Sequence, residues 1–153
     1  MSQRMTPSAT PDLAALHARI EASFVRQGMM KHLGARLVSV APGAVEIALP
    51  YSERVTQQQG GYHGGATGAL ADIAAGYAGL TVAEVGQEVT TVEYKINFLA
   101  AFQGGELRAR GQVVRAGKRL IITTAEVVHL DEDGGESPCA LMQQTLATVK
   151  QTY

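Results

Sequence analysis

The segment that decides the fold spans residues 60–85 and reads GGYHGGATGALADIAAGYAGLTVAEV. Between residues 66 and 85 the only charged side chains are those of Asp72 and Glu84. That length suits a bilayer, but ten of the twenty residues are Ala or Gly, and an aspartate inside a membrane span is costly. We therefore interpret residues 65–85 as a buried helix and expect no membrane segment.

Strand-like patterns lie on both sides of this helix. Residues 35–49 alternate around a Pro42-Gly43 turn, and residues 51–63 form a polar loop. Four further strand-like runs follow the helix: 92–98, 107–113, 120–130 and 139–149. Strands joined by short turns are antiparallel, and the 65–85 helix is the most apolar cover for such a sheet. The order predicts an α+β fold, with an antiparallel sheet of four to six strands wrapped around one long central helix.

The N-terminal region predicts a tail and one additional helix. Residues 1–10 are polar and contain no apolar signal segment, so we expect a disordered tail and a cytoplasmic protein. Thr10 and Pro11 resemble the cap and first position of a helix over 11–28, which Gly28 would end. Residues 11–153 are expected to form a single domain.

Composition excludes several classes of function. The net charge of −1 leaves no basic surface for nucleic acid or an anionic membrane. One cysteine excludes a disulfide framework, and His17, His32 and His129 have no partner at ligand spacing, so no metal site is expected.

Asp72 is the first candidate functional residue. It lies about 200° around the predicted helix from Leu70, which belongs to a stripe expected to pack on the sheet. Small residues share its face, which suggests that something approaches the helix backbone there: Gly68, Ala75, Gly76 and Gly79. The alternative interpretation is an exposed, solvated aspartate without a function.

The glycine-rich segment before the helix supplies a second candidate. Its backbone N–H groups lie at the positive end of the helix dipole, where they can stabilise an oxyanion. Gly65 and Asp72 are seven residues apart, or about 10.5 Å along the axis. One helix therefore cannot bring both to one carbonyl carbon. If both act, Asp72 comes from a second copy of the chain, and the hypothesis is a symmetric dimer with shared sites.

These residues resemble those of the hotdog-fold acyl-CoA thioesterases, in the PaaI-like branch that acts on phenylacetyl-CoA. The resemblance covers roughly residues 33–149 and is carried by residues 60–65 with Ala71-Asp72, supported by residues 90–99 and 114–118. It implies the hotdog fold and hydrolysis of an acyl-CoA thioester without a cofactor. It also implies a homodimer with active sites at the interface, often assembled as a dimer of dimers into a homotetramer, and the sequence leaves dimer and tetramer both open.

The resemblance also implies a role for each site residue. Asp72 acts as general base or nucleophile, and the Gly65 N–H is the oxyanion donor. Gln57 supplies the amide six residues before His63, where asparagine is usual, and Thr91 or Thr90 holds the attacking water. The implied substrate contacts are His63, which also shapes the turn, Gly64, Thr90, Arg115, Gly117, Lys118 and Arg119. The last four lie in a turn that could grip the CoA phosphates or remain solvated.

Several alternatives stay open at this point. Ala100-Ala101 replaces a proline common in the family, and the run of glutamines over 57–59 leaves the position of the amide uncertain by one residue. The other functions considered are a non-catalytic acyl-CoA binding or sensing module and a hotdog dehydratase. The sequence distinguishes neither aryl from alkyl acyl groups nor CoA from an acyl-carrier protein.

Overall fold

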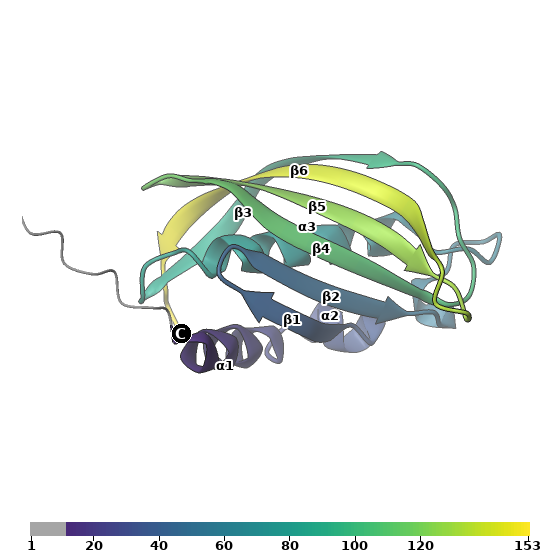
Figure 1. Cartoon of the computed structure of the whole chain (residues 1–153), viewed down its shortest axis with the longest axis horizontal. Helices are drawn as coiled ribbons and strands as arrows, with labels where there is room; N and C mark the ends of the chain where they lie inside the picture. The colour runs from purple at the N-terminus through teal and green to yellow at the C-terminus, as the bar shows by residue number, and fades with distance from the viewer. Residues whose placement is uncertain (1–11) are drawn as a thin grey trace, which may run out of the picture.

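The computed structural model describes residues 12–153, in which one curved antiparallel sheet wraps around a central helix (Figure 1). The sheet order is β1-β2-β4-β5-β6-β3. The strands are β1 (Arg36–Ala41), β2 (Ala44–Pro50), β3 (Gln87–Phe98), β4 (Glu106–Ala116), β5 (Leu120–Leu130) and β6 (Glu136–Lys150). The predicted α+β architecture is confirmed, and each strand-like run of the sequence forms a strand.

The N-terminal helix is shorter than predicted. Helix α1 (Leu13–Phe24) begins after Asp12, whose side chain accepts hydrogen bonds from the N–H groups of Ala14 and Ala15. Asp12 is therefore the N-cap, and the helix does not start at Pro11 as predicted. Thr10, Pro11 and the predicted tail over 1–10 lie outside the described residues.

The sequence analysis missed a second short helix, α2 (Gly28–Leu33). Gly28 does not end α1 but begins α2, and the chain then turns at Gly34 with a φ of 81°. Helix α2 has only six residues and no side-chain cap, so it carries no periodic pattern that the sequence could reveal. A single 3₁₀ turn, η1 (Glu53–Val55), lies in the polar loop.

The central helix α3 (Gly64–Leu80) lies behind the sheet in Figure 1 and ends five residues before the predicted boundary. Thr81 follows it, and its hydroxyl donates to the Ala78 carbonyl and accepts from the Gly43 N–H of the β1–β2 turn. These two bonds tie the end of the helix to the sheet.

The small residues of α3 do not all share the face of Asp72. A Cβ at Gly79 would overlap Leu146 of β6, and a Cβ at Gly111 of β4 would overlap the Ala74 carbonyl. Ala75 is fully buried against β4. Gly79 and Ala75 therefore allow the chain's own sheet to pack closely on the backbone of α3. Gly76 alone has open space beside it.

Strand β3 lies at the edge of the sheet and contains a β-bulge at Val92. Thr91 pairs with Leu146 and Glu93 with Thr145, which leaves Val92 as the extra residue. The bulge changes the alternation of side chains, so Thr91 and Tyr94 both face the helix side of the sheet. The other edge of this strand pairs with no strand of residues 12–153.

Candidate functional site

Asp72 lies half-buried on α3, where a strand of the sheet supplies a hydrogen-bond donor. Thr91 of β3 donates from its hydroxyl to the Asp72 Oδ1 atom at 2.7 Å. Both residues line a cavity of about 340 Å³. The sequence placed these two residues in one site, and the structure brings them together.

Gln144 of β6 is a further partner of Asp72 that the sequence analysis missed. Its Nε2 group donates to the same carboxylate oxygen and lies 3.1 Å from the Thr91 hydroxyl. The Thr123 hydroxyl of β5 donates in turn to the Gln144 Oε1 atom at 3.0 Å. On the helix-facing side of β6, Gln144 lies between Met142 and Leu146. A polar residue at such an inward position of the sequence pattern is the signal that could have revealed Gln144.

The cavity beside Asp72 has an apolar wall and a polar far side. Ile73, Leu80, Val89 and Leu146 contribute the apolar wall. On the far side the buried Tyr77 hydroxyl accepts from Gln27 at 2.9 Å and lies 3.1 Å from the Ser23 hydroxyl. Burial raises the pKa of Tyr77, so this phenol stays protonated. Helix α1 and the residues after it therefore form part of the cavity.

The N-terminus of α3 carries the second group of candidates. His63 is the N-cap, and its Nδ1 atom accepts a hydrogen bond from the Gly65 N–H at 2.8 Å. Both residues are exposed to solvent. The predicted oxyanion donor is thus held by its own cap in this structure, and His63 shapes the turn as the sequence suggested.

Gln57 lies close to this helix terminus. Its backbone pairs with the Gly61 carbonyl, and its side-chain oxygen accepts from the Gln59 N–H. Gln57 and Gly64 line a second cavity of about 360 Å³, together with Phe98 and Cys139. Cys139 is buried, and burial raises the pKa of its thiol, so it is not an activated nucleophile.

The two groups of candidates do not meet within one chain. The cavity that contains Asp72 and Thr91 shares no lining residue with the cavity that contains Gln57 and Gly64. The unbroken helix between Gly65 and Asp72 keeps them about 10.5 Å apart along its axis.

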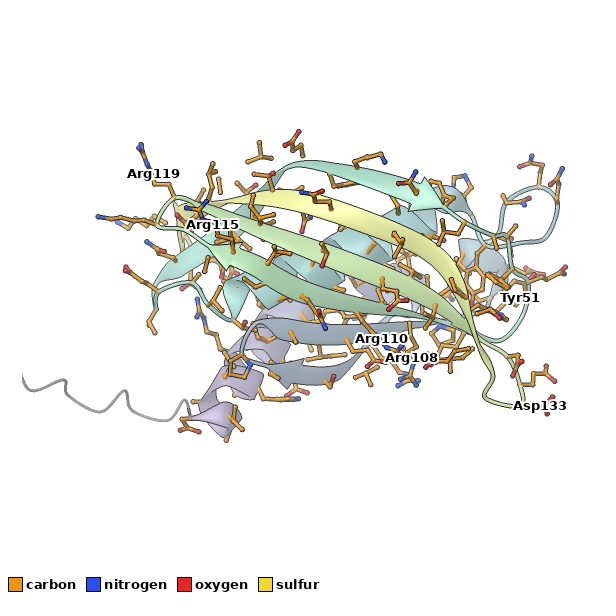
Figure 2. All side chains as sticks on the ribbon, turned by 45° about the horizontal axis from the view of Figure 1, so that its top comes forward. Tyr51, Arg108, Arg110, Arg115, Arg119 and Asp133 are labelled. Carbon is orange, nitrogen blue, oxygen red and sulfur yellow. The ribbon has the colours of Figure 1, made fainter. Side chains whose placement is uncertain are left out.

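The remaining predicted substrate contacts lie away from Asp72. Thr90 pairs with Ala147 and points to the face of the sheet opposite Thr91. The predicted phosphate-binding residues Arg115, Gly117, Lys118 and Arg119 are exposed in and beside the β4–β5 turn. Figure 2 shows Arg115 and Arg119 at one end of the molecule and Tyr51, which binds the Gly60 carbonyl, near the other. This turn is therefore far from the glycine-rich segment of the same chain.

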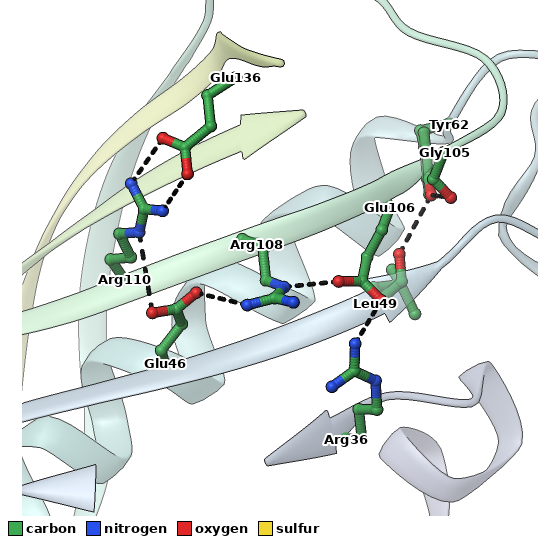
Figure 3. A network of polar contacts seen from close by, with 9 residues as sticks. All are labelled: Arg36, Glu46, Leu49, Tyr62, Gly105, Glu106, Arg108, Arg110 and Glu136. Atoms are coloured by element: carbon green, nitrogen blue, oxygen red, sulfur yellow. Dashed lines mark hydrogen bonds and ion pairs between the residues drawn. The ribbon is translucent and has the colours of Figure 1, made fainter. Parts of the chain in front are cut away.

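A separate network of charges covers the outer face of the sheet (Figure 3). Three arginines alternate with three glutamates across β1, β2, β4 and β6, in the order Arg36, Glu106, Arg108, Glu46, Arg110 and Glu136. Burial alone raises the pKa of Glu106, but the hydrogen bonds from Arg108 and Arg36 outweigh it and hold that pKa below its usual value. Every charge of this network has a partner of opposite sign.

Within residues 12–153, no helix is long and apolar enough to cross a membrane. The same residues contain no group of three or more His, Cys, Asp or Glu side chains arranged to hold a metal ion.

Comparison with known proteins identifies the family. Residues 59–136, half of the chain, match the family model of the thioesterase superfamily. The chain belongs to this superfamily. The proofreading thioesterase EntH of Klebsiella pneumoniae is 31% identical over 80% of this chain and 84% of its own length. The protein is thus a hydrolase of the thioesterase superfamily.

Solved structures of other proteins agree with this assignment. A thioesterase family protein from Silicibacter pomeroyi is 37% identical, with a TM-score of 0.85 over 89% of this chain and 99% of that one. The PaaI protein of the phenylacetic acid degradation operon of E. coli is 23% identical, with a TM-score of 0.80 over 92% of this chain and 97% of that one. The latter likeness concerns the fold, and it confirms the predicted hotdog architecture.

Proposed function

We propose that this thioesterase hydrolyses acyl-CoA to the free acid and CoA, with Asp72 as the catalytic carboxylate. The observation that carries the proposal is the pairing of Asp72 with Thr91 on the wall of a cavity large enough for an acyl group. Residues 12–153 place no hydrogen-bond donor on the second carboxylate oxygen, Oδ2, which leaves it free to act.

A carboxylate suffices for this reaction because a thioester is an activated acyl group. As general base, Asp72 takes a proton from a water held by Thr91, the water oxygen attacks the carbonyl carbon, and the C–S bond breaks. As nucleophile, Asp72 forms an anhydride, the thiolate leaves, and water then cleaves the anhydride. Both routes release one acid and one thiol for each water consumed.

The oxyanion donor in this proposal is the Gly65 N–H of a second copy of the chain. The thioester oxygen would replace His63 Nδ1 as the acceptor of the Gly65 N–H, or share that N–H with it. The Gln57 amide would orient the thioester. Three large side chains of β3, exposed at its open edge, support such a dimer: Val92 at 59%, Tyr94 at 45% and Phe98 at 54%.

The basic turn completes the proposed substrate contacts. Arg115, Lys118 and Arg119 are exposed cations that none of the ion pairs among residues 12–153 includes. They are suited to hold the phosphates of CoA at the surface of the dimer. We place His63, Gly64 and Thr90 in the wider substrate path on the strength of the family resemblance alone.

The first test measures free-thiol release from a panel of aryl-CoA and alkyl-CoA thioesters. Asp72→Asn keeps the shape and removes the charge, so we expect kcat to fall by about 10²–10⁴-fold in a variant that remains folded. Asp133→Asn, in the exposed β5–β6 turn, is the matched control and should retain wild-type turnover. Turnover that survives Asp72→Asn would refute the role of this carboxylate. No turnover on any thioester would favour a binding module instead.

The second test addresses the shared site. Asp72→Asn and Gln57→Ala are each expected to be inactive as homodimers because each removes one half of every site. A 1:1 coexpression gives heterodimers in half of the molecules, each with one intact site, so about a quarter of wild-type activity should return. If the two halves acted within one chain, both sites of a heterodimer would remain defective and no activity would return.

A further inference from the structure

Along the buried stretch of β6 from Ala140 to Leu146, the helix-facing side chains are apolar except that of Gln144. Met142 and Leu146 are buried on either side of Gln144, which is only 1% exposed. Burial of an amide among apolar side chains is unfavourable unless its polar atoms are hydrogen-bonded. Packing alone does not require an amide at this position, so the role of Gln144 is sought in its hydrogen bonds.

The hydrogen bonds of Gln144 fix the orientation of its amide. The Asp72 carboxylate can only accept, so the atom of Gln144 that faces it is the Nε2 donor. The Thr123 hydroxyl, fully buried on β5, then donates to Oε1 on the other side. The two contacts agree on one orientation, and exchanging the nitrogen and the oxygen would lose the bond to the carboxylate.

The two side chains that donate to the Asp72 carboxylate reach the same oxygen. Gln144 and Thr91 both donate to Oδ1 of Asp72, and the Gln144 Nε2 atom also lies 3.4 Å from the Asp72 backbone carbonyl. The series of hydrogen bonds from Thr123 through Gln144 thus holds the Asp72 carboxylate in one rotamer, with Oδ2 directed away from these donors. A fixed carboxylate keeps its reactive oxygen at the right distance from water or substrate without reorganisation during the reaction.

We propose that Gln144 is a positioning residue for Asp72, itself held in place by Thr123. This proposal rests on the proposed function of Asp72. Gln144 does not line the cavity that contains Asp72 and lies behind the carboxylate. Its removal should therefore reduce kcat and leave KM nearly unchanged.

The test compares two neighbouring glutamines on opposite faces of β6. Gln144→Met preserves length and removes the donor, and we expect kcat to fall by about 10–100-fold with KM within about threefold. Gln143→Met, exposed on the outer face, is the matched control and should retain kcat. Equal kcat values for the two variants would overturn the proposal, as would a change confined to KM.

A double-mutant cycle separates positioning from general stability. Thr123→Val alone should lower kcat by a smaller factor than Gln144→Met, and it should add no further loss in the Gln144→Met background. If the two losses of kcat multiply in the double variant, Thr123 and Gln144 act independently. That result would contradict a connected series of hydrogen bonds from Thr123 through Gln144 to Asp72. If Asp72→Asn abolishes turnover while Thr123→Val and Gln144→Met do not alter kcat, the proposed function stands and only this inference fails.

A third variant decides the question if Gln144→Met does not fold. Gln144→Glu has the same shape, but an ionised glutamate would repel the Asp72 carboxylate. As the pH rises above neutral, we expect the turnover of Gln144→Glu to fall at least about tenfold more than that of the wild type. Only the protonated glutamic acid, which forms at lower pH, can replace the amide as donor. A pH profile parallel to that of the wild type would overturn the positioning role.

Discussion

The two polar networks on opposite faces of the sheet are built from different groups. The outer network contains six charged side chains, and each has an oppositely charged partner. The inner network contains one charge, that of Asp72, which accepts from the Thr91 hydroxyl and the Gln144 amide, and the Thr123 hydroxyl donates in turn to Gln144. Paired charges on a solvated face contribute little beyond solubility and local order. A single charge held by neutral donors beside a cavity keeps its reactivity, and this difference is why we propose the inner face of the sheet as the functional one.

The largest effect on stability is expected where the helix that carries Asp72 rests on the sheet. Gly111→Ala would force a methyl group into the Ala74 carbonyl, and we expect a loss of about 2–3 kcal/mol of unfolding free energy. Gly76→Ala, on the same helix but beside open space, should instead gain about 0.5–1 kcal/mol from helix propensity. Urea unfolding measures both. Similar values for the two variants would show that close helix–sheet contact does not constrain the inner face.

A smaller effect is expected on the outer face. Arg108→Gln removes the cation that pairs with both Glu46 and Glu106, and it should cost about 1 kcal/mol in urea unfolding. Thioesterase turnover should stay within about twofold of wild type because no residue of this network lines the cavity beside Asp72. A tenfold loss of kcat in a folded Arg108→Gln variant would break the distinction between the two faces.

The smallest effect is expected on the free energy of unfolding at acidic pH. Glu106 and Glu136 have folded-state pKa values below 4.5, their usual value, so the unfolded chain binds more protons than the folded one at moderately acidic pH. Their contribution to stability is present above pH 4.5 and is lost as the pH falls through the folded-state values. Glu106→Gln should therefore flatten the decline in unfolding free energy between about pH 5 and pH 3, by about 1 kcal/mol at most. A variant whose decline matched that of the wild type would show that this carboxylate is not held by its arginines.

Local patterns were sufficient to predict most of the fold. The alternation over 120–130 matches β5, and the long Ala-rich segment matches α3, because each pattern repeats with the period of its element. Helix α2 and the end of α3 were missed because both depend on tertiary contacts, such as the one between Thr81 and the β1–β2 turn.

The candidate site was predictable only in part. Asp72 and Thr91 were found together because the family resemblance fixes both. Gln144 was not found, because its partners are distant in sequence and only the register of three strands brings them together. The faces of Ala75 and Gly79 were misjudged because a sheet that curves around a helix covers more of its circumference than a flat one.

The bulge at Val92 has a consequence for how this protein can change over evolutionary time. It divides β3 into two segments, each of which pairs with successive residues of β6. The segment up to Thr91 serves the chain's own cavity, and Val92 with the segment after it carries the exposed side chains at the open edge. Deletion of Val92 would leave a regular ladder in which Glu93 still pairs with Thr145 and Tyr94 with Gln144, so the later side chains would keep their faces. Mutations can thus alter the chemistry of one segment while the other keeps its contacts, so activity and assembly can diversify separately along a single strand.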